Sequence, residues 1–565
     1  MDIPLKIKRK FEGHWVNFTL CTVLLTCVVL PDFLINWATH SQRAFGNWEA
    51  FGGILLTVVG LSYAKKTLFW GVWGVFFIIE LCQFIHIVYF GTTIRHATIL
   101  LSFGEARDIF VLTYLKFVWF VFPIVGACYG LGAFIFNRLR PFKKTTTWTS
   151  AAIVFYGITL CATDFSFLPR SAIPRLIYHG QMTGVLFLKC INMTDVPIHS
   201  LVSSLRSILC VVIRIFFNPS NPSYLSYQFI SEAPLARNIL LVVGESLTAS
   251  HMSLFGYHRP TTPFLCALAK NKQHFLYKKS YASSVFTASS LPYMFNCIRE
   301  PHHYALFNSP QSNLIQIAKK QGFKVTVITT NDGTQCFGIG IDDLYTGVRV
   351  RTYPFTLPEK VLWTQEDLGL PKILSSLSLE TEKNLIIVHM YAPHSPYENR
   401  YRKAPECALY DDRESANARI NAYDNAVVFT DMILKQLFLE FEKRFGSEED
   451  NFFVFFSDHG ELLGEKDPLT GAELWGHGNL TPACLLTPFF FYTTSTLGNW
   501  TKKYSDRPAF SGYEVSRFIL ELLGVGVTNP NQKTPETYFA SDGVIGGCYL
   551  EYTIDPEGNM RVIDS

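Results

Sequence analysis

The sequence lacks several features that would mark common classes of protein. None of its 13 cysteines stands in a Cys-x-x-Cys pair, which argues against a zinc site built from thiolates. Charged residues make up only 17 % of the chain and the net charge is +3, so it has no electrostatic footprint of nucleic-acid binding. There is also no internal repeat and no low-complexity run.

Apolar residues are abundant instead, and they gather in the first third of the chain. Hydrophobic residues form 48 % of the 565 residues, which is high for a wholly soluble protein. Five segments come near the ~20 residues that a bilayer crossing requires. They are residues 16–37, 48–64, 67–90, 109–136 and 150–168. We therefore predict an α-helical membrane domain with about five transmembrane helices over residues 1–168.

Basic residues predict how this domain is oriented. They lie in the N-terminal segment 6–10, at Lys65 and Lys66, and in the segment 137–144. These segments fall on one side if all five helices cross, and the positive-inside rule makes that side cytoplasmic. Everything after residue 168 then lies outside. The second helix is the shortest, and four crossings would place the rear of the chain inside.

The rest of the chain divides into a linker and a second domain. Residues 169–237 are predicted to be a juxtamembrane amphipathic linker with a turn-rich end. From residue 238 strands and helices alternate, which indicates a mainly parallel sheet covered by helices over residues 238–565. Strands are predicted at 238–244, 324–330, 384–391, 451–456 and 487–493, and helices at about 287–297, 309–321, 414–444 and 512–524.

Metal-type ligands follow two of these predicted strands. Glu245 comes after the apolar strand 238–244, and Asp458 and His459 come after the strand 451–456. Open α/β sheets bind ligands outside the carboxyl ends of their strands. Carboxylate oxygen and imidazole nitrogen suit zinc, so we predict one shared cation site. Glu245 alone could equally be the first-turn acid of a helix.

Two further histidines lie in loops. His394 stands between Pro393 and Pro396, which hold the backbone extended and suit a side chain aimed into a cleft. His477 lies between two glycines in Trp-Gly-His-Gly. His389 is different, because it lies inside a predicted strand and is better interpreted as a hydrogen-bonded core residue.

A run of small hydroxyl residues, 281–295, leads into a predicted helix. A helix N-terminus favours anions such as phosphate, and a zinc-bound hydroxyl there could attack phosphorus. The alternative is simple N-capping by Thr287 or Ser289. The pattern by itself does not choose among Ser284, Thr287, Ser289 and Ser290.

Taken in order, these motifs are recognisable. They read VVGES, SLFGYHRPTTP, FTASSLPYMF, HMYAPHSPY, NAYDNAVVFTD, SDHGE and WGHGN. The succession resembles the bacterial lipopolysaccharide phosphoethanolamine transferases of the sulfatase and alkaline phosphatase superfamily. The resemblance covers the whole chain, because that family also has five N-terminal membrane helices and an external catalytic domain. It implies a sulfatase-like, alkaline-phosphatase-like α/β fold for residues 238–565.

The resemblance also implies a metal site and a nucleophile. By position in the motifs, the zinc ligands are Glu245, Thr287, Asp458 and His459, and Thr287 is also the attacking group. Its place five residues before Pro292 matches the family pattern. One or two Zn²⁺ ions are implied as the cofactor.

Four residues are implied to bind substrate. His394 and His477 match histidines that contact the phosphoethanolamine group or a second zinc. Glu105 resembles a residue that contacts the lipid head group, and Asn331 resembles an asparagine of the substrate pocket.

The chain departs from the family pattern at several places. Tyr293 follows Pro292, no cysteine closely precedes Thr287, and the lysine usual after Asn331 is missing. The usual Gly-Ser-His-Gly-Pro appears as Ala-Pro-His-Ser-Pro at 392–396. These differences leave all the implied metal ligands in place.

The implied activity is transfer of phosphoethanolamine from phosphatidylethanolamine to lipid A or another lipopolysaccharide or glycan acceptor. The implied location is the bacterial inner membrane, with the catalytic domain in the periplasm. A phosphoglycerol transferase or a phosphatase on the same scaffold is an alternative, as is an inactive membrane-tethered binding protein. The absence of a Cys-x-Pro-x-Arg run counts against a sulfatase.

Overall fold

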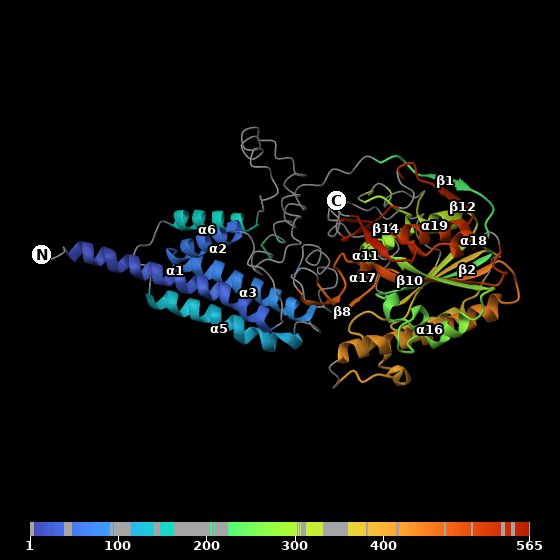
Figure 1. Cartoon of the computed structure of the whole chain (residues 1–565), viewed down its shortest axis with the longest axis horizontal. Helices are drawn as coiled ribbons and strands as arrows, with labels where there is room; N and C mark the ends of the chain where they lie inside the picture. Colours follow the sequence, from blue (N-terminus) through green and yellow to red (C-terminus); the bar gives the residue numbers. More distant parts are fainter. Residues whose placement is uncertain are drawn as a thin grey trace. The chain divides into compact units, whose positions relative to one another are not determined.

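The computed structural model consists of two compact units, which are described separately (Figure 1). The first is formed mainly by residues 1–219 and the second mainly by residues 220–565. The structure describes residues 5–38, 48–90, 94, 115–139, 147–162, 204–205, 208, 224–301, 303, 306, 312–330, 360–379, 382–413, 417–467, 471–498, 501–532, 537–543 and 549–563. Glu105, Asn331 and most of the predicted linker 169–237 lie outside these residues.

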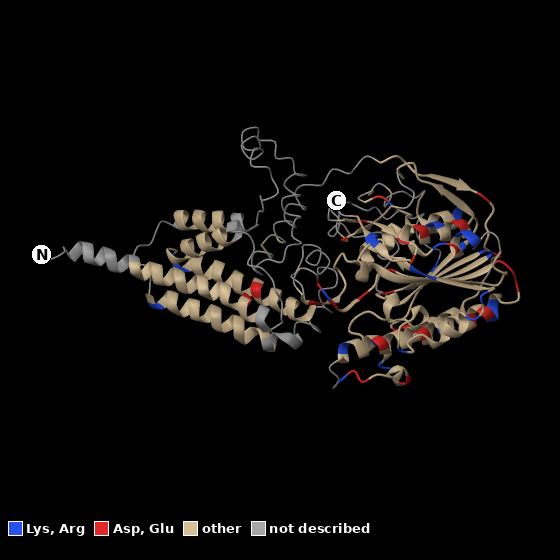
Figure 2. Ribbon diagram, in the orientation of Figure 1, with Lys and Arg blue, Asp and Glu red and all other residues tan. Residues whose placement is uncertain are grey.

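The first unit contains a helix at each of the five predicted positions. These are α1 (Leu5–Ala38), α2 (Trp48–Ser62), α3 (Lys66–Phe90), α5 (Leu115–Leu139) and α6 (Thr147–Ala162). Three apolar stretches of the described helices are long enough to cross a membrane, namely Trp15–Ile35, Lys66–Phe90 and Val121–Leu139. The apolar parts of α2 and α6, Phe51–Ser62 and Trp148–Ile158, are shorter. Charged residues are sparse on the parts of these helices that are coloured by residue type in Figure 2.

Small residues let two of these helices pack closely. A Cβ atom at Gly157 of α6 would lie 2.4 Å from Thr57 Oγ1 and 2.8 Å from the Gly53 carbonyl oxygen of α2. Glycine at this position therefore allows α2 and α6 to approach backbone to backbone, as small residues do in membrane helix pairs.

The second unit is built on a sheet of eight strands in the order β11-β3-β10-β7-β2-β6-β4-β5. Five of the strands were predicted: β2 (Asn238–Gly244), β4 (Lys324–Thr329), β6 (Asn384–His389), β7 (Asn451–Ser457) and β10 (Leu486–Thr493). The others are β3 (Phe275–Tyr281), β5 (Lys360–Trp363) and β11 (Ala509–Ser511). Neighbours pair in parallel except around β10, which runs antiparallel to both β3 and β7. The predicted mainly parallel sheet is thus confirmed.

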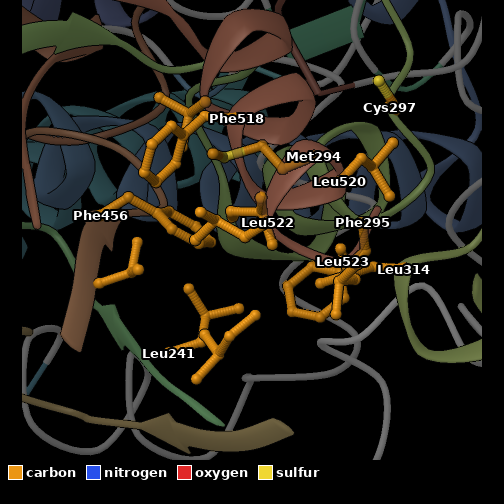
Figure 3. Close-up of a cluster of buried hydrophobic side chains, with 14 of the residues drawn as sticks. Leu241, Met294, Phe295, Cys297, Leu314, Phe456, Phe518, Leu520, Leu522 and Leu523 are labelled. Carbon is orange, nitrogen blue, oxygen red and sulfur yellow. The ribbon is translucent and has the colours of Figure 1, made fainter. Parts of the chain in front are cut away.

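Helices cover both faces of this sheet (Figure 1). The larger ones are α11 (Thr287–Phe295), α12 (Leu314–Lys320), α16 (Ala418–Phe445) and α19 (Gly512–Leu522). Alternate side chains of the central strands point to opposite faces. On one face Leu241 and Phe456 join the buried cluster with Phe295 and Phe518 (Figure 3). On the other, Phe453 packs against Phe438 of α16.

The remaining described strands form small sheets. β1 (Gln228–Ser231) pairs with β12 (Val525–Thr528), and β13 (Tyr538–Ser541), β14 (Tyr549–Ile554) and β15 (Met560–Val562) form a three-stranded sheet. β8 (Leu462–Lys466) pairs with β9 (Glu473–Gly476). Two shorter helices are α15 (Glu398–Tyr401) and α18 (Lys502–Ser505).

Candidate metal centre and active site

The two strand ends that carry the predicted ligands lie side by side. β2 and β7 are parallel neighbours, and their last paired residues are Gly244 and Ser457. Glu245 and Asp458 therefore leave the same edge of the sheet on adjacent strands, as the sequence predicted. Both are buried, with 2 % and 0 % of their surfaces exposed.

Thr287 joins these residues from a third segment. It is the first residue of α11, and its Oγ1 lies 3.0 Å and 3.1 Å from the two carboxylate oxygens of Glu245. The same Oγ1 is 3.3 Å from His459 Nε2. The structure thus brings together the side chains of Glu245, Thr287, Asp458 and His459, which lie far apart in the sequence.

The other hydroxyls of the run have different partners. Ser284 and Ser289 bond each other with their Oγ atoms 2.6 Å apart, and Ser290 donates to the Asp458 carbonyl oxygen. Thr287 is therefore the member of this group of four whose hydroxyl contacts the carboxylate of Glu245. Sequence pattern could not make this distinction.

The four side chains fit a Zn²⁺ ion. Ligand atoms of Glu245, Asp458 and His459 all lie within 4.8 Å of one another. Asp458 Oδ2 is buried and accepts no hydrogen bond from the residues that the structure describes. His459 Nδ1 donates to the Gly460 carbonyl oxygen at 2.9 Å, which leaves Nε2 facing the carboxylates, 3.3 Å from Asp458 Oδ2. An oriented imidazole and an unused carboxylate oxygen are the expected donors for zinc.

The electrostatics of this group also favour a cation. Burial and the neighbouring Asp458 carboxylate raise the pKa of Glu245 to about 7. Burial disfavours the His459 imidazolium, but the carboxylates of Asp458 and Glu245 outweigh that effect and raise the pKa of His459 to about 10. Two buried carboxylates thus stabilise one positive charge on the imidazole. A metal ion bound here would replace that proton as the positive charge between the carboxylates.

A second group of ligands adjoins the first. Atoms of His459, Glu461 and His477 also lie within 4.8 Å of one another, and His477 Nδ1 is 3.2 Å from Glu461 Oε2. Glu461 accepts a hydrogen bond from the Tyr397 hydroxyl at 2.5 Å. The sequence analysis assigned no role to Glu461. The residue could have been found there, because it is the last residue of the Ser-Asp-His-Gly-Glu motif, three positions after Asp458.

His394 continues this row of histidines. Its ring centroid lies 5.7 Å from that of His477, which in turn lies 4.5 Å from that of His459. His394 Nδ1 lies 2.6 Å from the Ser395 carbonyl oxygen, to which it donates. Burial, followed by electrostatic interaction with His477 and Arg400, lowers the pKa of His394 well below its ordinary value. His394 is therefore neutral, and its Nε2 is an acceptor.

His389 differs from these residues as expected. It lies within β6 and is fully buried, and burial lowers its pKa to about 4. Of the described cysteines in the second unit, Cys266, Cys297, Cys407 and Cys484, none forms a disulfide.

Comparison with known proteins agrees with this geometry. The sulfatase family model matches residues 237–525, just over half of the 565 residues. An Escherichia coli K12 protein named "Putative transferase YhbX" is 28 % identical over 335 residues, covering 58 % of this chain and 53 % of that protein. The phosphoethanolamine transferase EptA of Helicobacter pylori is 29 % identical over 245 residues, covering 40 % and 42 %. The chain spans about half the length of the curated relatives it matches.

A solved structure shares the fold over most of the chain. The integral membrane lipooligosaccharide phosphoethanolamine transferase A of Neisseria meningitidis is similar with a TM-score of 0.53 and 16 % identity. The match covers 92 % of this chain and 95 % of that one, so it includes the helical unit as well as the α/β unit. Because the sulfatase model matches more than half of the chain, including all eight strands of the large sheet and the candidate ligands, this chain belongs to the sulfatase family.

Proposed function

We propose that this protein transfers phosphoethanolamine from phosphatidylethanolamine to a lipid or sugar acceptor, with lipid A or the lipopolysaccharide core as the acceptor. The proposal rests on one observation above all: the Thr287 hydroxyl lies against Glu245 and His459 at the edge of the sheet. The names of relatives such as Helicobacter pylori EptA support the same activity.

The chemistry divides into two half-reactions. Bound Zn²⁺ would neutralise phosphate charge and lower the pKa of the Thr287 hydroxyl. In the first half-reaction Thr287 Oγ1 forms a bond to the phosphorus of the donor, and diacylglycerol leaves with a proton. In the second an acceptor oxygen attacks that phosphorus, and the bond to Thr287 breaks. We assign neutral His394 the role of accepting a proton from an acceptor hydroxyl, and His477 the role of contacting the phosphoethanolamine group.

The helical unit has a role in this proposal. Donor and acceptor are both confined to a membrane surface, and a membrane anchor keeps the active site there. In this proposal the chain consists of a membrane domain (1–168), a linker (169–237) and a periplasmic catalytic domain (238–565). Glu105 and Asn331 remain proposed substrate contacts.

Intact mass spectrometry of the purified full-length chain tests the proposal. The protein is incubated in detergent with zinc and phosphatidylethanolamine. We expect a mass gain of one phosphoethanolamine group, and no gain in Thr287→Ala. Ser289→Ala is a matched control, because it removes a hydroxyl from the same helix and should keep the adduct.

The alternatives give other results. An adduct from phosphatidylglycerol but not from phosphatidylethanolamine would assign a phosphoglycerol transferase. Hydrolysis of the donor without transfer to any acceptor would assign a phosphatase. An adduct retained in Thr287→Ala would exclude Thr287 as the attacking group, and complete absence of donor turnover with zinc bound would favour a binding protein.

A further inference from the structure

Asp367 lies at the ends of two strands, on the edge of the sheet that carries the candidate metal centre. β4 and β6 are parallel neighbours, and their last paired residues are Thr329 and His389. β6 is in turn a neighbour of β2, whose end carries Glu245. Asp367 comes from a separate segment, the short helix η7 (Asp367–Gly369) that follows β5. It is buried, with 5 % of its surface exposed, and it contacts residues that follow β4 and β6.

Both oxygens of the Asp367 carboxylate accept hydrogen bonds from these strand ends. Oδ2 accepts from the backbone N–H of Ala392 at 2.8 Å, and Oδ1 accepts from that of Tyr391 at 3.0 Å. Oδ1 also accepts from the hydroxyl of Thr330 at 2.8 Å. Thr330 directly follows β4, whereas Tyr391 and Ala392 follow β6. An ionised carboxylate offers two acceptor oxygens and no donor, so it suits a buried position where three donors converge.

The hydrogen bonds of Asp367 fix the turn that carries His394. The backbone N–H of His394 donates to the carbonyl oxygen of Tyr391 at 3.0 Å, which closes this turn. The His394 ring also stacks on the Tyr391 ring, with the two centroids 4.9 Å apart and an angle of 14° between the planes. Tyr391 thus contacts His394 through its backbone and through its ring. Direct contacts therefore lead from Asp367 through Tyr391 to the imidazole of His394.

We propose that Asp367 is a positioning residue: it holds the turn 391–394 and thereby places the His394 imidazole for proton transfer. The part of this inference that concerns transfer rests on the proposed function, in which His394 accepts a proton from an acceptor hydroxyl. Asp367 acts through Tyr391 and touches no reacting atom. A misplacement of about 1 Å can slow a reaction about 100-fold, so a loosened turn is enough to slow the transfer.

The step that Asp367 serves is the second half-reaction. The acceptor oxygen forms a bond to the phosphorus carried by Thr287, and the bond from that phosphorus to Thr287 Oγ1 breaks. The proton of the acceptor hydroxyl passes to His394 Nε2, and it returns by way of water to the Thr287 oxygen. The first half-reaction does not use His394 in this scheme, so it should not depend on Asp367.

Asp431 provides a matched control for Asp367. It is a buried aspartate of α16, 2 % exposed, and its two oxygens also accept from neighbouring backbone N–H groups. Its donors are Phe264 at 2.8 Å and Leu265 at 3.1 Å, in the helix α10 (Pro263–Leu268). None of the predicted site residues lies in α10 or α16. A loss of stability alone should therefore affect Asp367→Asn and Asp431→Asn alike.

Hydrogen exchange tests the hold on the turn without any substrate. In Asp367→Asn one acceptor oxygen is replaced by an NH2 group, which faces a backbone N–H and cannot accept from it. Exchange of the amides of Tyr391 and Ala392 should therefore become faster, by roughly tenfold or more. Mass spectrometry of peptides containing residues 390–394, from the full-length protein in detergent, measures it. Asp431→Asn should leave these peptides unchanged, and equal exchange in wild type and Asp367→Asn would overturn the inference.

Intact mass separates the two half-reactions. Each variant is loaded with phosphoethanolamine from phosphatidylethanolamine in the presence of zinc, and loss of the adduct to water and to added glucose is followed. We expect Asp367→Asn to load normally and to lose the adduct roughly 10- to 100-fold more slowly, with the half-saturating glucose concentration unchanged. Asp431→Asn should match wild type in both steps. Slowing of loading and loss by the same factor in Asp367→Asn would indicate less folded protein and would overturn the inference.

A double-variant cycle shows whether Asp367 acts through His394. His394→Ala removes the proposed proton acceptor, so adding Asp367→Asn should slow the transfer little further. Effects that multiply would show that Asp367 acts elsewhere, which contradicts the inference. Thr330→Val removes one of the three donors and keeps the carboxylate, so it should give a smaller loss in the same direction. It carries the test if Asp367→Asn does not fold, and wild-type exchange and transfer in Thr330→Val would then overturn the inference.

Failure of this inference is distinct from failure of the proposed function. If wild type and Asp367→Asn load and lose the adduct at equal rates, Asp367 has no positioning role and the proposed transferase stands. If wild type forms no adduct, the proposed function is wrong, and hydrogen exchange alone decides whether Asp367 holds the turn of His394. Faster exchange in Asp367→Asn than in Asp431→Asn supports that hold, and equal exchange overturns it.

Discussion

Asp458 divides its two carboxylate oxygens between the fold and the candidate metal centre. Oδ1 accepts from the backbone N–H of Ser246 at 3.0 Å and of His459 at 2.7 Å. Oδ2 accepts no hydrogen bond within the described part of the chain and points among the other ligands. Ser246 itself has a left-handed φ of 52°, and its hydroxyl donates to Glu245 at 2.9 Å. The backbone between the ligands thus orients both carboxylates.

Replacing Asp458 should remove the metal. Asp458→Ala deletes both the unused oxygen and one buried charge, so zinc affinity should fall by more than the roughly 10–100-fold typical of losing an outer-shell partner. Elemental analysis of the purified protein measures the zinc content. Asp506→Ala, at an exposed aspartate, is the control and should keep its zinc. Equal zinc in Asp458→Ala and wild type would remove Asp458 from the ligand set.

Zinc binding should depend on pH with a defined sign. The pKa of His459 is raised to about 10 and that of Glu245 to about 7, so below these values a proton occupies the group of ligands. Zinc must displace it, and affinity should therefore rise with pH, by about tenfold per unit for each proton displaced. Calorimetry in two buffers of different ionisation heat counts the protons released. Binding without proton release would contradict this prediction.

Some of the residues of the candidate site could be predicted from the sequence, and others could not. Glu245, Asp458 and His459 could be predicted because they end apolar strands. Thr287 could not be distinguished by pattern from the neighbouring serines, since the choice depends on which hydroxyl faces Glu245.

At the scale of elements, α16 supports the loop that carries Glu245, a candidate metal ligand. The Tyr423 hydroxyl of α16 donates to the Ser246 carbonyl oxygen at 2.8 Å and accepts from the Thr248 N–H at 2.9 Å. Tyr423 is fully buried. One side chain therefore holds both sides of the turn that follows β2.

Removing this hydroxyl should loosen the turn. Tyr423→Phe leaves a buried N–H and a buried carbonyl without their partner, which costs about 1–3 kcal/mol. We expect a lower thermal midpoint and weaker zinc binding, both measured on the full-length protein by thermal scanning with and without added zinc. Tyr277→Phe, at a partly exposed tyrosine of β3, serves as the control. A midpoint equal to that of the control would show that the hydroxyl does not support the turn.

Strands differed in how well the sequence predicted them. β2, β6 and β7 are central, and their continuous apolar runs were recognised. β3 was missed because Lys278 and Lys279 interrupt its apolar pattern, yet it pairs with both β10 and β11. β10 and β11 are distant from β3 in the sequence and pair with its two edges. This pairing outweighs the polar residues in the sequence of β3 itself.

At the scale of the whole molecule, an apolar helical unit and a sulfatase-family α/β unit occur in one chain. The predicted helix positions are confirmed, with three stretches long enough to cross a membrane among the described residues. The likeness to the Neisseria meningitidis membrane protein extends over 92 % of the chain. The orientation predicted from the basic segments stays a prediction.

The sequence by itself determined the apolar helices, the alternation of strands and helices, and the residues that end β2 and β7. These follow from local composition and from the rule that parallel strands present their carboxyl ends at one edge. Only the tertiary structure decided that Thr287 is the hydroxyl against Glu245 and that Glu461 lies beside His477. Such facts depend on distances between segments far apart in the chain, which no local pattern records.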